Sequence, residues 1–447
     1  MGDTMRTVHK KQPISSFQII TFSFLAVILI GALLLMLPFA TKDGEGASLI
    51  DALFTATSAT CVTGLIVQDT ATYWSLFGHI VILCMIQIGG MGVMTMALMI
   101  SKLAGKRIGL MQRSVMQESI SAPTLGGIVQ MTRFIFIAVL VIELTGTVVL
   151  ATVFCPQFGF GQGLWYALFH SVSAFCNAGF DLMGIGGKFS SFTAYTGNAV
   201  VNITIMVLIV VGGLGFFVWD DILKNKWRFR KYRLQSKVVL IVTAILLVLP
   251  AIYFFFAEFT NFSINDRIFA SLFQSVTLRT AGFNSVDFAL VSEVGILLMI
   301  ALMLVGGSPG STAGGMKTTT LAVLCAAAWS VFTKKDEAQM FRRRIADSTV
   351  KQAATVLWMY VILFFTSGLL ISAIDGVPVI TALFETSSAV ATVGVTMGIT
   401  PQLSTVSHLI LIALMYLGRV GGLTLVFAAF SERKTNAKYP QERITVG

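Results

Sequence analysis

Charged residues are scarce in this chain. Asp, Glu, Lys and Arg make up 12% of its 447 residues, and 55% are hydrophobic. A soluble domain carries about 25% charge. The mean hydropathy is +0.84, and no long polar segment separates the apolar runs. These values exclude a soluble enzyme and predict a polytopic membrane protein.

Cysteine and histidine are also sparse, and neither is clustered. The spacings fit no disulfide framework, zinc site or catalytic triad, so we expect no enzymatic activity. The cysteines are expected to be small buried hydrophobes. Two of them lie three residues before a recurring glycine, where the backbone matters more than the sulfur. The residues are Cys61, Cys84, Cys155, Cys176, Cys325, His9, His79, His170 and His408.

A cleavable signal peptide is not indicated. The first apolar run, 17–39, follows Arg6, Lys10 and Lys11, but it is longer than a typical signal core of about 7–15 residues and no small-x-small site follows it. It is long enough to cross a hydrocarbon core of about 30 Å. We therefore expect a retained first span.

The 31 Lys and Arg residues lie mostly in the segments 6–11, 102–133, 224–237, 334–351 and 433–443. Acidic residues gather in the short segments between them. The positive-inside rule then places the five basic segments and both termini in the cytoplasm of a multi-pass plasma-membrane protein. Because topology accounts for the basic segments, no nucleic-acid partner is expected.

A short phrase recurs four times, between two apolar runs each time. It begins near a phenylalanine, has a Ser/Thr-rich middle and ends at a glycine. Phe to Gly is ten residues in three copies and nine in the third. Apolar run, short helix, glycine turn and apolar run form the layout of a re-entrant pore loop. The phrases are 54–64, 169–179, 273–282 and 384–394.

The apolar runs pair around these phrases and predict eight transmembrane helices. The fold class is all-α, with four parallel M1–pore helix–M2 repeats around a pseudo-fourfold pore. Inverted repeats would alternate in orientation, and these do not. The expected spans are 17–39, 76–101, 131–154, 198–219, 237–258, 290–333, 352–374 and 404–430. The expected segments are a cytoplasmic N-terminus at 1–16, repeats at 17–110, 131–222, 237–333 and 350–430, and a cytoplasmic C-terminus at 431–447.

The glycine ends of the four phrases are the candidate selectivity filter. Non-helical backbone is tolerated at membrane depth where it lines a cavity or is buried in protein. The phrases carry almost no formal charge, so backbone carbonyls must replace the hydration shell of the ion, which suits K⁺. The predicted filter residues are Thr60, Cys61, Val62, Thr63, Gly64, Cys176, Asn177, Ala178, Gly179, Thr280, Ala281, Gly282, Thr392, Val393 and Gly394.

A second set of glycines follows each phrase. At 89–92 and 212–215 they indicate close helix packing by small residues. The copy in the fourth repeat is at 421–422. The third copy lies in the apolar run 290–333, which is about twice the length of one span. Pro309 must break a helix there. We expect a gating loop at 305–316, with a simple kink as the alternative. The candidate gating residues are Gly306, Gly307, Ser308, Pro309, Gly310, Ser311, Thr312, Ala313, Gly314, Gly315, Lys317 and Arg419.

Two of these residues are cations at membrane depth, where a charge is costly and usually functional. Lys317 follows the loop directly. Arg419 occupies the equivalent position in the fourth repeat, so its guanidinium is expected to donate to loop carbonyls and hold the loop across the pore. The alternative is a structural bridge to a carboxylate such as Glu143.

The four repeats, the loop 307–315, Arg419 and the filter phrases, especially 279–283, resemble the Trk/Ktr/HKT superfamily of potassium transporters. The chain looks most similar to the membrane subunit of bacterial Ktr systems. The resemblance covers nearly the whole chain. It implies a potassium-uptake pore in a bacterial membrane, a homodimer and a cytosolic RCK-type ring. ATP or ADP would be bound by that partner and not by this chain, and Na⁺ is a possible activator. Sodium-permeable members carry serine where this chain has Gly64, so potassium is favoured.

Two modes of transport remain open at this point. The leading hypothesis is channel-like movement of K⁺ down its electrochemical gradient. The alternative is a secondary transporter in which Na⁺ or H⁺ movement drives K⁺.

Overall fold

The computed structural model describes residues 15–103, 109–119, 127–288 and 291–421, together with 440 and 442. These residues are mainly α-helical, with a short antiparallel hairpin of β1 (Gln339–Met340) and β2 (Arg343–Arg344). Most of the two predicted cytoplasmic termini, and the predicted last span beyond residue 421, lie outside the described residues.

Each predicted repeat opens with a long apolar helix. Ser15 starts the first of them by a reciprocal capping box with Gln18, which satisfies backbone N–H groups that a helix start leaves unpaired. By length and composition, each of the four is long enough to cross a membrane. They are α1 (Ser16–Leu35), α7 (Ile128–Phe158), α11 with its π-helical end η4 (Leu234–Tyr253 and Phe254–Glu258) and α15 (Asp347–Asp375).

A shorter helix follows in each repeat and ends at a predicted filter segment. Ser48 and Ser263 cap two of these helices. The C-terminal halves are buried while the first turns are more exposed, so each helix points its C-terminal end into the molecule. These pore helices are α2 (Leu49–Thr60), α8 (Phe160–Cys176), α12 (Ile264–Thr277) and α16 (Val379–Val390).

The second apolar run is broken in each of the first three repeats. In the first repeat α4 (Leu76–Met91) and α5 (Val93–Leu103) meet at 98°, and in the second α9 (Ala199–Leu214) and α10 (Phe216–Asn225) meet at 95°. The breaks fall at Gly92 and Gly215, whose φ values of 85° and 94° suit glycine. The apolar runs expected as spans at 76–101 and 198–219 are therefore bent at these glycines and are not continuous straight helices. Four helices pass as membrane spans among the described residues, or six if each bent pair counts once.

The third repeat also interrupts its second helix, and the fourth is described only as far as Gly421. The third divides into α13 (Glu293–Met303) and α14 (Thr318–Phe332), with non-helical residues between them. In the fourth, α17 (Thr405–Val420) ends at Gly421, where φ is 87°. Smaller elements are η1 (Pro38–Ala40), α3 (Thr70–Tyr73), α6 (Leu110–Ser119), η2 (Thr193–Tyr195), η3 (Phe229–Lys231) and η6 (Thr400–Gln402).

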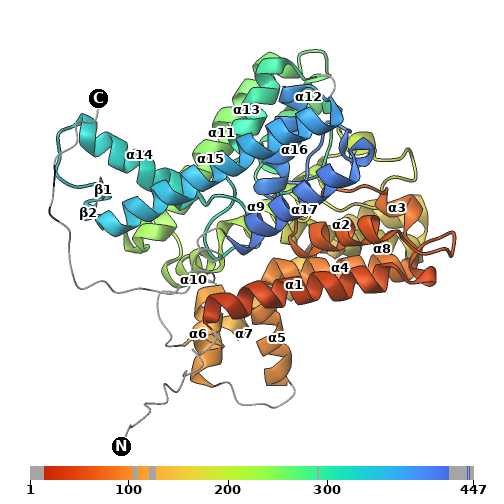
Figure 1. Ribbon diagram of the computed structural model, residues 1–447, viewed down its shortest axis with the longest axis horizontal. Helices are drawn as coiled ribbons and strands as arrows, with labels where there is room; N and C mark the ends of the chain where they lie inside the picture. Colours follow the sequence, from red (N-terminus) through yellow and green to blue (C-terminus); the bar gives the residue numbers. More distant parts are fainter. Residues whose placement is uncertain are drawn as a thin grey trace, which may run out of the picture.

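The pore helices pack in a cyclic order. Three of them contact the second helix of the preceding repeat: α8 contacts α4, α12 contacts α9, and α16 contacts α13. The pore helix of the first repeat, α2, contacts α17 of the fourth. The last pair brings the first and fourth repeats together, and Figure 1 shows α17 beside α2. The four repeats therefore surround one axis.

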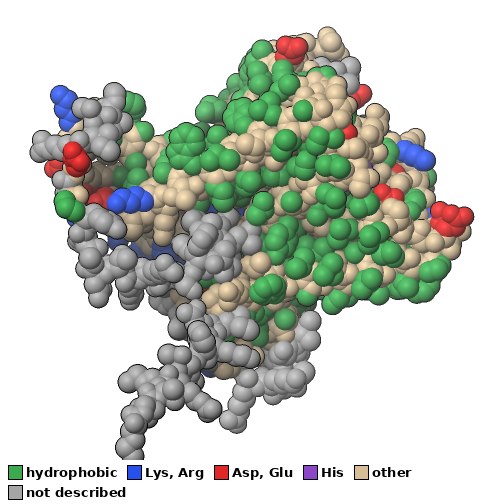
Figure 2. All heavy atoms as spheres, in the orientation of Figure 1, with side chains coloured by type: hydrophobic (Ala, Val, Ile, Leu, Met, Phe, Trp, Pro, Cys, Tyr) green, Lys and Arg blue, Asp and Glu red, His purple; other side chains and the backbone are tan. Residues whose placement is uncertain are grey.

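The outer surface of this assembly is apolar. On α1, Phe22 and Leu33 are 64% and 65% exposed. Figure 2 shows hydrophobic side chains spread along α1 and α15, with charged side chains gathered toward the two ends of the molecule. Large exposed apolar areas on a well-packed protein mark a membrane or protein interaction surface, and here they cover helices long enough to span a bilayer.

Candidate functional site: a ring of four glycine segments

The four predicted filter segments share an unusual backbone conformation. Two residues before each glycine, a side-chain-bearing residue has positive φ, which is rare for Thr and an outlier for Val. Such strain persists where the surroundings impose it, as at ligand sites. The φ values are 56° at Val62, 60° at Asn177, 65° at Thr280, 52° at Thr392, 95° at Gly64, 70° at Gly179, 82° at Gly282 and 95° at Gly394.

One backbone hydrogen bond fixes each segment to the end of its own pore helix. Ala178 N donates to Ser173 O over 2.8 Å, five residues back. In the third repeat Ala281 N donates to Thr277 O over 2.9 Å, four residues back. The shorter turn accounts for the nine-residue spacing of the third phrase, and it leaves its glycine in register with the other three.

The segments close on one another in a ring. A β-carbon added to any of the four glycines would strike the carbonyl oxygen that precedes the next glycine around the axis. We call the four glycines and these four carbonyl residues the glycine ring. The β-carbon distances are 2.6 Å from Gly64 to Ala178 O, 2.8 Å from Gly179 to Ala281 O, 2.7 Å from Gly282 to Val393 O and 2.0 Å from Gly394 to Thr63 O.

The glycine ring supplies oxygen atoms without formal charge. Besides its carbonyls, the hydroxyls of Thr60, Thr63 and Thr392 are buried and have no hydrogen-bond partner among the residues that the structure describes. Unpaired buried oxygens are costly unless a ligand or water satisfies them. Neutral oxygens are the ligands that suit a weakly hydrated monovalent cation, so this donor set fits K⁺ as the transported ion.

Two buried carboxylic acids support the ring from behind, and sequence reasoning did not assign them this place. Gln87 donates to Glu143 over 3.3 Å, and the Cys176 thiol donates to the Gln87 amide oxygen over 3.7 Å. Glu385 accepts from Met397 N at 3.0 Å and from the Thr400 hydroxyl at 2.8 Å. The sequence could have indicated them, because Glu143 in α7 and Glu385 in α16 are each the one acidic residue of an apolar helix.

The second set of glycines packs directly below the ring, taking the predicted cytoplasmic side as down. β-Carbons added to Gly89, Gly212 and Gly418 would lie 1.9, 2.0 and 2.1 Å from Thr60 O, Phe175 O and Val390 O, at the ends of three pore helices. Close packing at Gly89 and Gly212 agrees with the sequence expectation, whereas Gly418 was not among the glycines that it named. The bends at Gly92 and Gly215 are an additional role that it missed.

Residues 305–316 form a non-helical segment, which we call the intramembrane loop. Its base is closed by Gly306 N donating to Met316 O over 2.8 Å. The Thr312 hydroxyl donates to Phe175 O over 3.0 Å. A β-carbon on Gly314 would lie 2.0 Å from the Thr392 hydroxyl oxygen. The loop therefore touches the end of the second pore helix and the fourth filter segment.

The bend in the second repeat holds the other side of the loop. Ser308 N donates to Gly213 O over 3.1 Å, and Thr312 N donates to Gly212 O over 3.2 Å. Phe216 N, the first amide of α10, donates to Gly310 O over 2.8 Å. Because α10 starts at the bend, its direction and the position of the loop are linked by these bonds.

Three cationic side chains donate to carbonyls at the loop. Arg419 donates to Thr312 O and also to Gly89 O and Gly90 O of α4. Lys317 Nζ donates to Ala313 O over 2.8 Å and to Gly314 O over 3.2 Å. Arg279, which the sequence analysis did not include among the gating residues, donates to Gly306 O over 3.4 Å. Glu143, the alternative partner for Arg419, is bonded to Gln87 instead.

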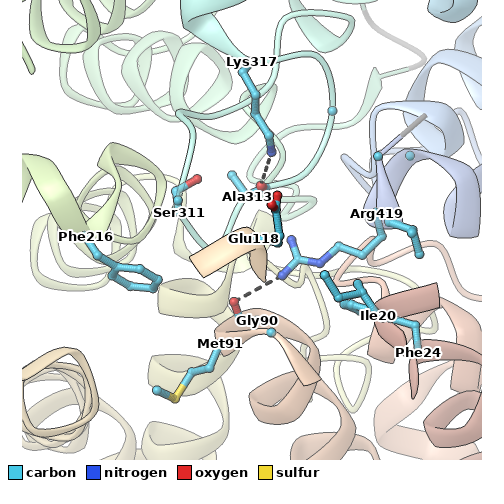
Figure 3. A pocket seen from close by; sticks show the side chains of 16 residues that line it. Ile20, Phe24, Gly90, Met91, Glu118, Phe216, Ser311, Ala313, Lys317 and Arg419 are labelled. Atoms are coloured by element: carbon cyan, nitrogen blue, oxygen red, sulfur yellow. Dashed lines mark hydrogen bonds between the residues drawn. The ribbon is translucent and has the colours of Figure 1, made fainter. Parts of the chain in front are cut away.

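The remaining loop residues complete the same structure. Ser311 Oγ donates to Ser308 O over 2.7 Å, and Gly315 has a φ of 67° beside Ala391 O. Below the loop lies a cavity of about 210 Å³, lined by Lys317, Arg419 and Glu118 among others. Figure 3 shows Lys317, just before α14, and Arg419 of α17 reaching toward it, with Phe216 on a third side.

Comparison with known proteins is consistent with this geometry. The family model TrkH, described as a cation transport protein, matches residues 5–439. The chain is 40% identical to the potassium/sodium uptake protein NtpJ of Enterococcus hirae, covering 99% of this chain and 100% of that protein. It is 39% identical to the Ktr system potassium uptake protein B of Bacillus subtilis, covering 96% of each.

A solved structure has the same fold. The crystal structure of the potassium transporter TrkH from Vibrio parahaemolyticus superposes with a TM-score of 0.73, at 19% identity, over 95% of this chain and 87% of that one. Fold and comparisons together define a mainly helical membrane protein of the cation-transporter class. The chain belongs to the TrkH/Ktr family of cation transport proteins.

Proposed function

We propose that this chain is the pore-forming membrane subunit of a potassium uptake system, with the glycine ring as its selectivity filter. The observation that carries the proposal is the cyclic closure, in which each glycine lies against the carbonyl of the next segment. Four uncharged backbone segments around one axis offer a dehydrated K⁺ a shell of carbonyl oxygens. The names of the relatives, which refer to potassium uptake, agree with this ion.

The topology belongs to the same proposal. With broken helices counted as the predicted second spans, four M1–pore helix–M2 repeats give eight crossings and cytoplasmic termini in a bacterial plasma membrane. The placement of basic segments supports this orientation.

The intramembrane loop is proposed as the gate. It lies below the ring, touches the second pore helix and the fourth filter segment, and is held by Arg279, Lys317 and Arg419. A non-helical loop with many short polar contacts is a suitable element for two discrete arrangements, since each contact is individually modest. If the loop were only a structural kink, altering it would leave the K⁺ flux unchanged.

Partner and regulation follow from the family resemblance. We propose a homodimer and a cytosolic RCK-type ring that binds ATP or ADP and acts on the gate. We include Na⁺ in the proposal, as an activator or as a second transported ion, because one relative is named a potassium/sodium uptake protein.

Flux into liposomes tests the function directly. The purified full chain should take up ⁸⁶Rb⁺, and the reversal potential should follow the K⁺ gradient and respond weakly to Na⁺. A reversal potential that depends on the Na⁺ or H⁺ gradient at fixed K⁺ would instead establish the coupled transporter. Absence of Rb⁺ uptake by correctly inserted protein, with and without the cytosolic partner, would contradict both modes.

A further inference from the structure

A groove opens beside the intramembrane loop, with Pro309 in its lining. Its volume is about 410 Å³, and it lies between the start of α11, the start of α14 and the residues between β2 and α15. Leu234, Val238, Val323 and Ile345 make it mainly apolar, and Pro309 of the loop forms part of its wall. An occupant of the groove therefore touches the loop.

The chain segments that flank the groove lining are rich in basic residues, and Arg344, which lines the groove itself, is paired with Glu337. On one side, Lys226, Arg228, Arg230 and Lys231 are exposed, and within the described part of the chain no carboxylate pairs with them. Their neighbours Lys224 and Arg233 are paired with Asp220 and Asp221. On the other side the exposed residues are Lys334, Lys335, Arg342 and Arg343.

The depth of the groove matches the boundary of the bilayer. On α11 the exposed apolar face begins at Ile241 and continues at Ile245, which are 38% and 49% exposed. Lys237 lies one turn before it. Trp227, between basic residues, is 99% exposed. Interleaved basic and aromatic side chains next to a lipid-facing helix are typical of the headgroup region.

We propose that this groove binds an anionic phospholipid of the cytoplasmic leaflet. Its phosphate would lie among the basic residues of the rim, because Arg and Lys pair strongly with phosphate oxygens. Its glycerol and upper acyl chain would occupy the apolar groove. A soluble protein partner would meet the charges but would leave an apolar groove at membrane depth unfilled, so the lipid is favoured.

Lipid binding in the groove is expected to change the flux in one direction, and this expectation rests on the proposed gating function of the loop. A lipid packed against Pro309 contacts the loop in its position below the glycine ring, where Gly310 O also accepts from Phe216 N of α10. A ligand shifts an equilibrium toward the state it contacts best. The bound lipid therefore stabilises the loop below the ring and lowers basal flux.

Lipid contact is measured independently of transport. The full chain is reconstituted in phosphatidylcholine vesicles that contain either brominated phosphatidylglycerol or brominated phosphatidylcholine. The fluorescence of Trp227 is obtained by subtracting the signal of the Trp227→Phe variant from that of the unmodified protein. We expect stronger quenching by the brominated anionic lipid. The double variant Arg230→Gln/Lys231→Gln should lose that preference, whereas Arg113→Gln/Arg133→Gln, the same charge change on exposed residues of α6 and α7, should keep it. Equal quenching by both lipids overturns the proposal.

Flux tests the coupling to the gate. Basal ⁸⁶Rb⁺ uptake should be about threefold lower with phosphatidylglycerol than with phosphatidylcholine alone, a modest population shift. Gln235→Trp fills the groove from an exposed position and should remove the lipid dependence, while Gln235→Ala should retain it. If glycerol phosphate in solution reproduces the inhibition, the site is a free-anion site and the lipid proposal is wrong. If no vesicle takes up Rb⁺, the proposed function fails, and quenching still decides whether lipid binds.

Discussion

At the residue scale, Gly64 is fixed by two independent constraints. Its φ of 95° is strained for any side chain, and a β-carbon would meet Ala178 O at 2.6 Å. Because the obstacle is a backbone carbonyl of the next filter segment, relief requires the ring itself to move. A serine at this position therefore changes the carbonyl arrangement instead of adding a passive hydroxyl.

Gly64→Ser is expected to raise Na⁺ permeability relative to K⁺ by about tenfold, corresponding to about 1.4 kcal/mol of lost discrimination. Reversal potentials in K⁺ and Na⁺ gradients measure the ratio. Gly44→Ser is the matched control, because Gly44 has a φ of 76° but nothing within 4 Å of its added β-carbon. An unchanged ratio in well-inserted Gly64→Ser protein would remove Gly64 from the filter.

Arg419 is the second residue with a defined role. It links the loop at Thr312 O to α4 at Gly89 O. Charge-assisted bonds to a buried group contribute about 1.5–3 kcal/mol each. If the contact closes the pore, Arg419→Ala should raise basal Rb⁺ flux about tenfold and leave ion preference unchanged. Arg419→Lys should restore closure only in part, since lysine lacks the planar five-donor fork.

Combining Arg419→Ala with shortening of the loop distinguishes a gate from a folding role. A contact that the deletion has already removed cannot be lost twice, so the two effects on flux should not add. Additive effects would show that Arg419 and the loop act separately. Lower yield of assembled Arg419→Ala protein without higher flux per molecule would assign the residue to folding.

At the element scale, α10 connects the loop to the basic segment 224–237. The connection is one backbone bond, from Phe216 N to Gly310 O, and it occurs at the first residue of α10. Proline is tolerated at this helix position and has no N–H, so the donor can be removed without breaking the helix.

Phe216→Pro is expected to raise basal flux several-fold by freeing the loop, in keeping with the modest net strength of one hydrogen bond, about 1 kcal/mol. Phe216→Ala is the matched control. It loses the same buried ring, which packs on Trp219 with centroids 5.1 Å apart, but it keeps the amide. Equal flux from the two variants would mean that the ring packing, and not the hydrogen bond, positions the loop.

The loop as a whole is tested by shortening Gly306–Gly315. The expected result is higher basal flux and weaker dependence on the cytosolic partner, since the loop can no longer reach the pore helix end at Phe175 O. Normal insertion with flux equal to the unmodified protein would reduce the loop to a structural kink.

The helices show how far sequence pattern extends. The phenylalanine-to-glycine phrases identified the four pore helices, because local spacing fixes where a short helix ends. The bends at Gly92 and Gly215 were missed. A glycine in an apolar run is compatible with packing or with a bend, and the choice depends on where the next repeat places its backbone. The partners of Arg279 and Phe216 are backbone carbonyls. Because every residue has a backbone carbonyl, the sequence does not indicate which one accepts these bonds.

At the scale of the whole molecule, the structure is a closed cycle of unequal members. Each pore helix packs against a helix of the adjacent repeat, and each ring glycine abuts the next segment. The distance from an added β-carbon to the carbonyl oxygen of the next segment nevertheless differs, from 2.8 Å at Gly179 to 2.0 Å at Gly394. The interface between the fourth and first repeats, which chain connectivity does not join, is therefore the tightest.

This asymmetry predicts an order of damage. All four glycine-to-alanine variants carry the strain of positive φ, roughly 1–2 kcal/mol, but Gly394→Ala adds the most severe backbone clash and Gly179→Ala the least. Stabilisation by K⁺ is the measurement, because an ion that binds only the folded ring raises the melting temperature. The K⁺-minus-Na⁺ shift should be smallest for Gly394→Ala and largest for Gly179→Ala, with Gly64→Ala and Gly282→Ala between them. Because each segment contacts the next, no variant should keep the full shift. A full K⁺ shift in Gly394→Ala would mean that the four segments bind ions independently and that the cycle is not the binding unit.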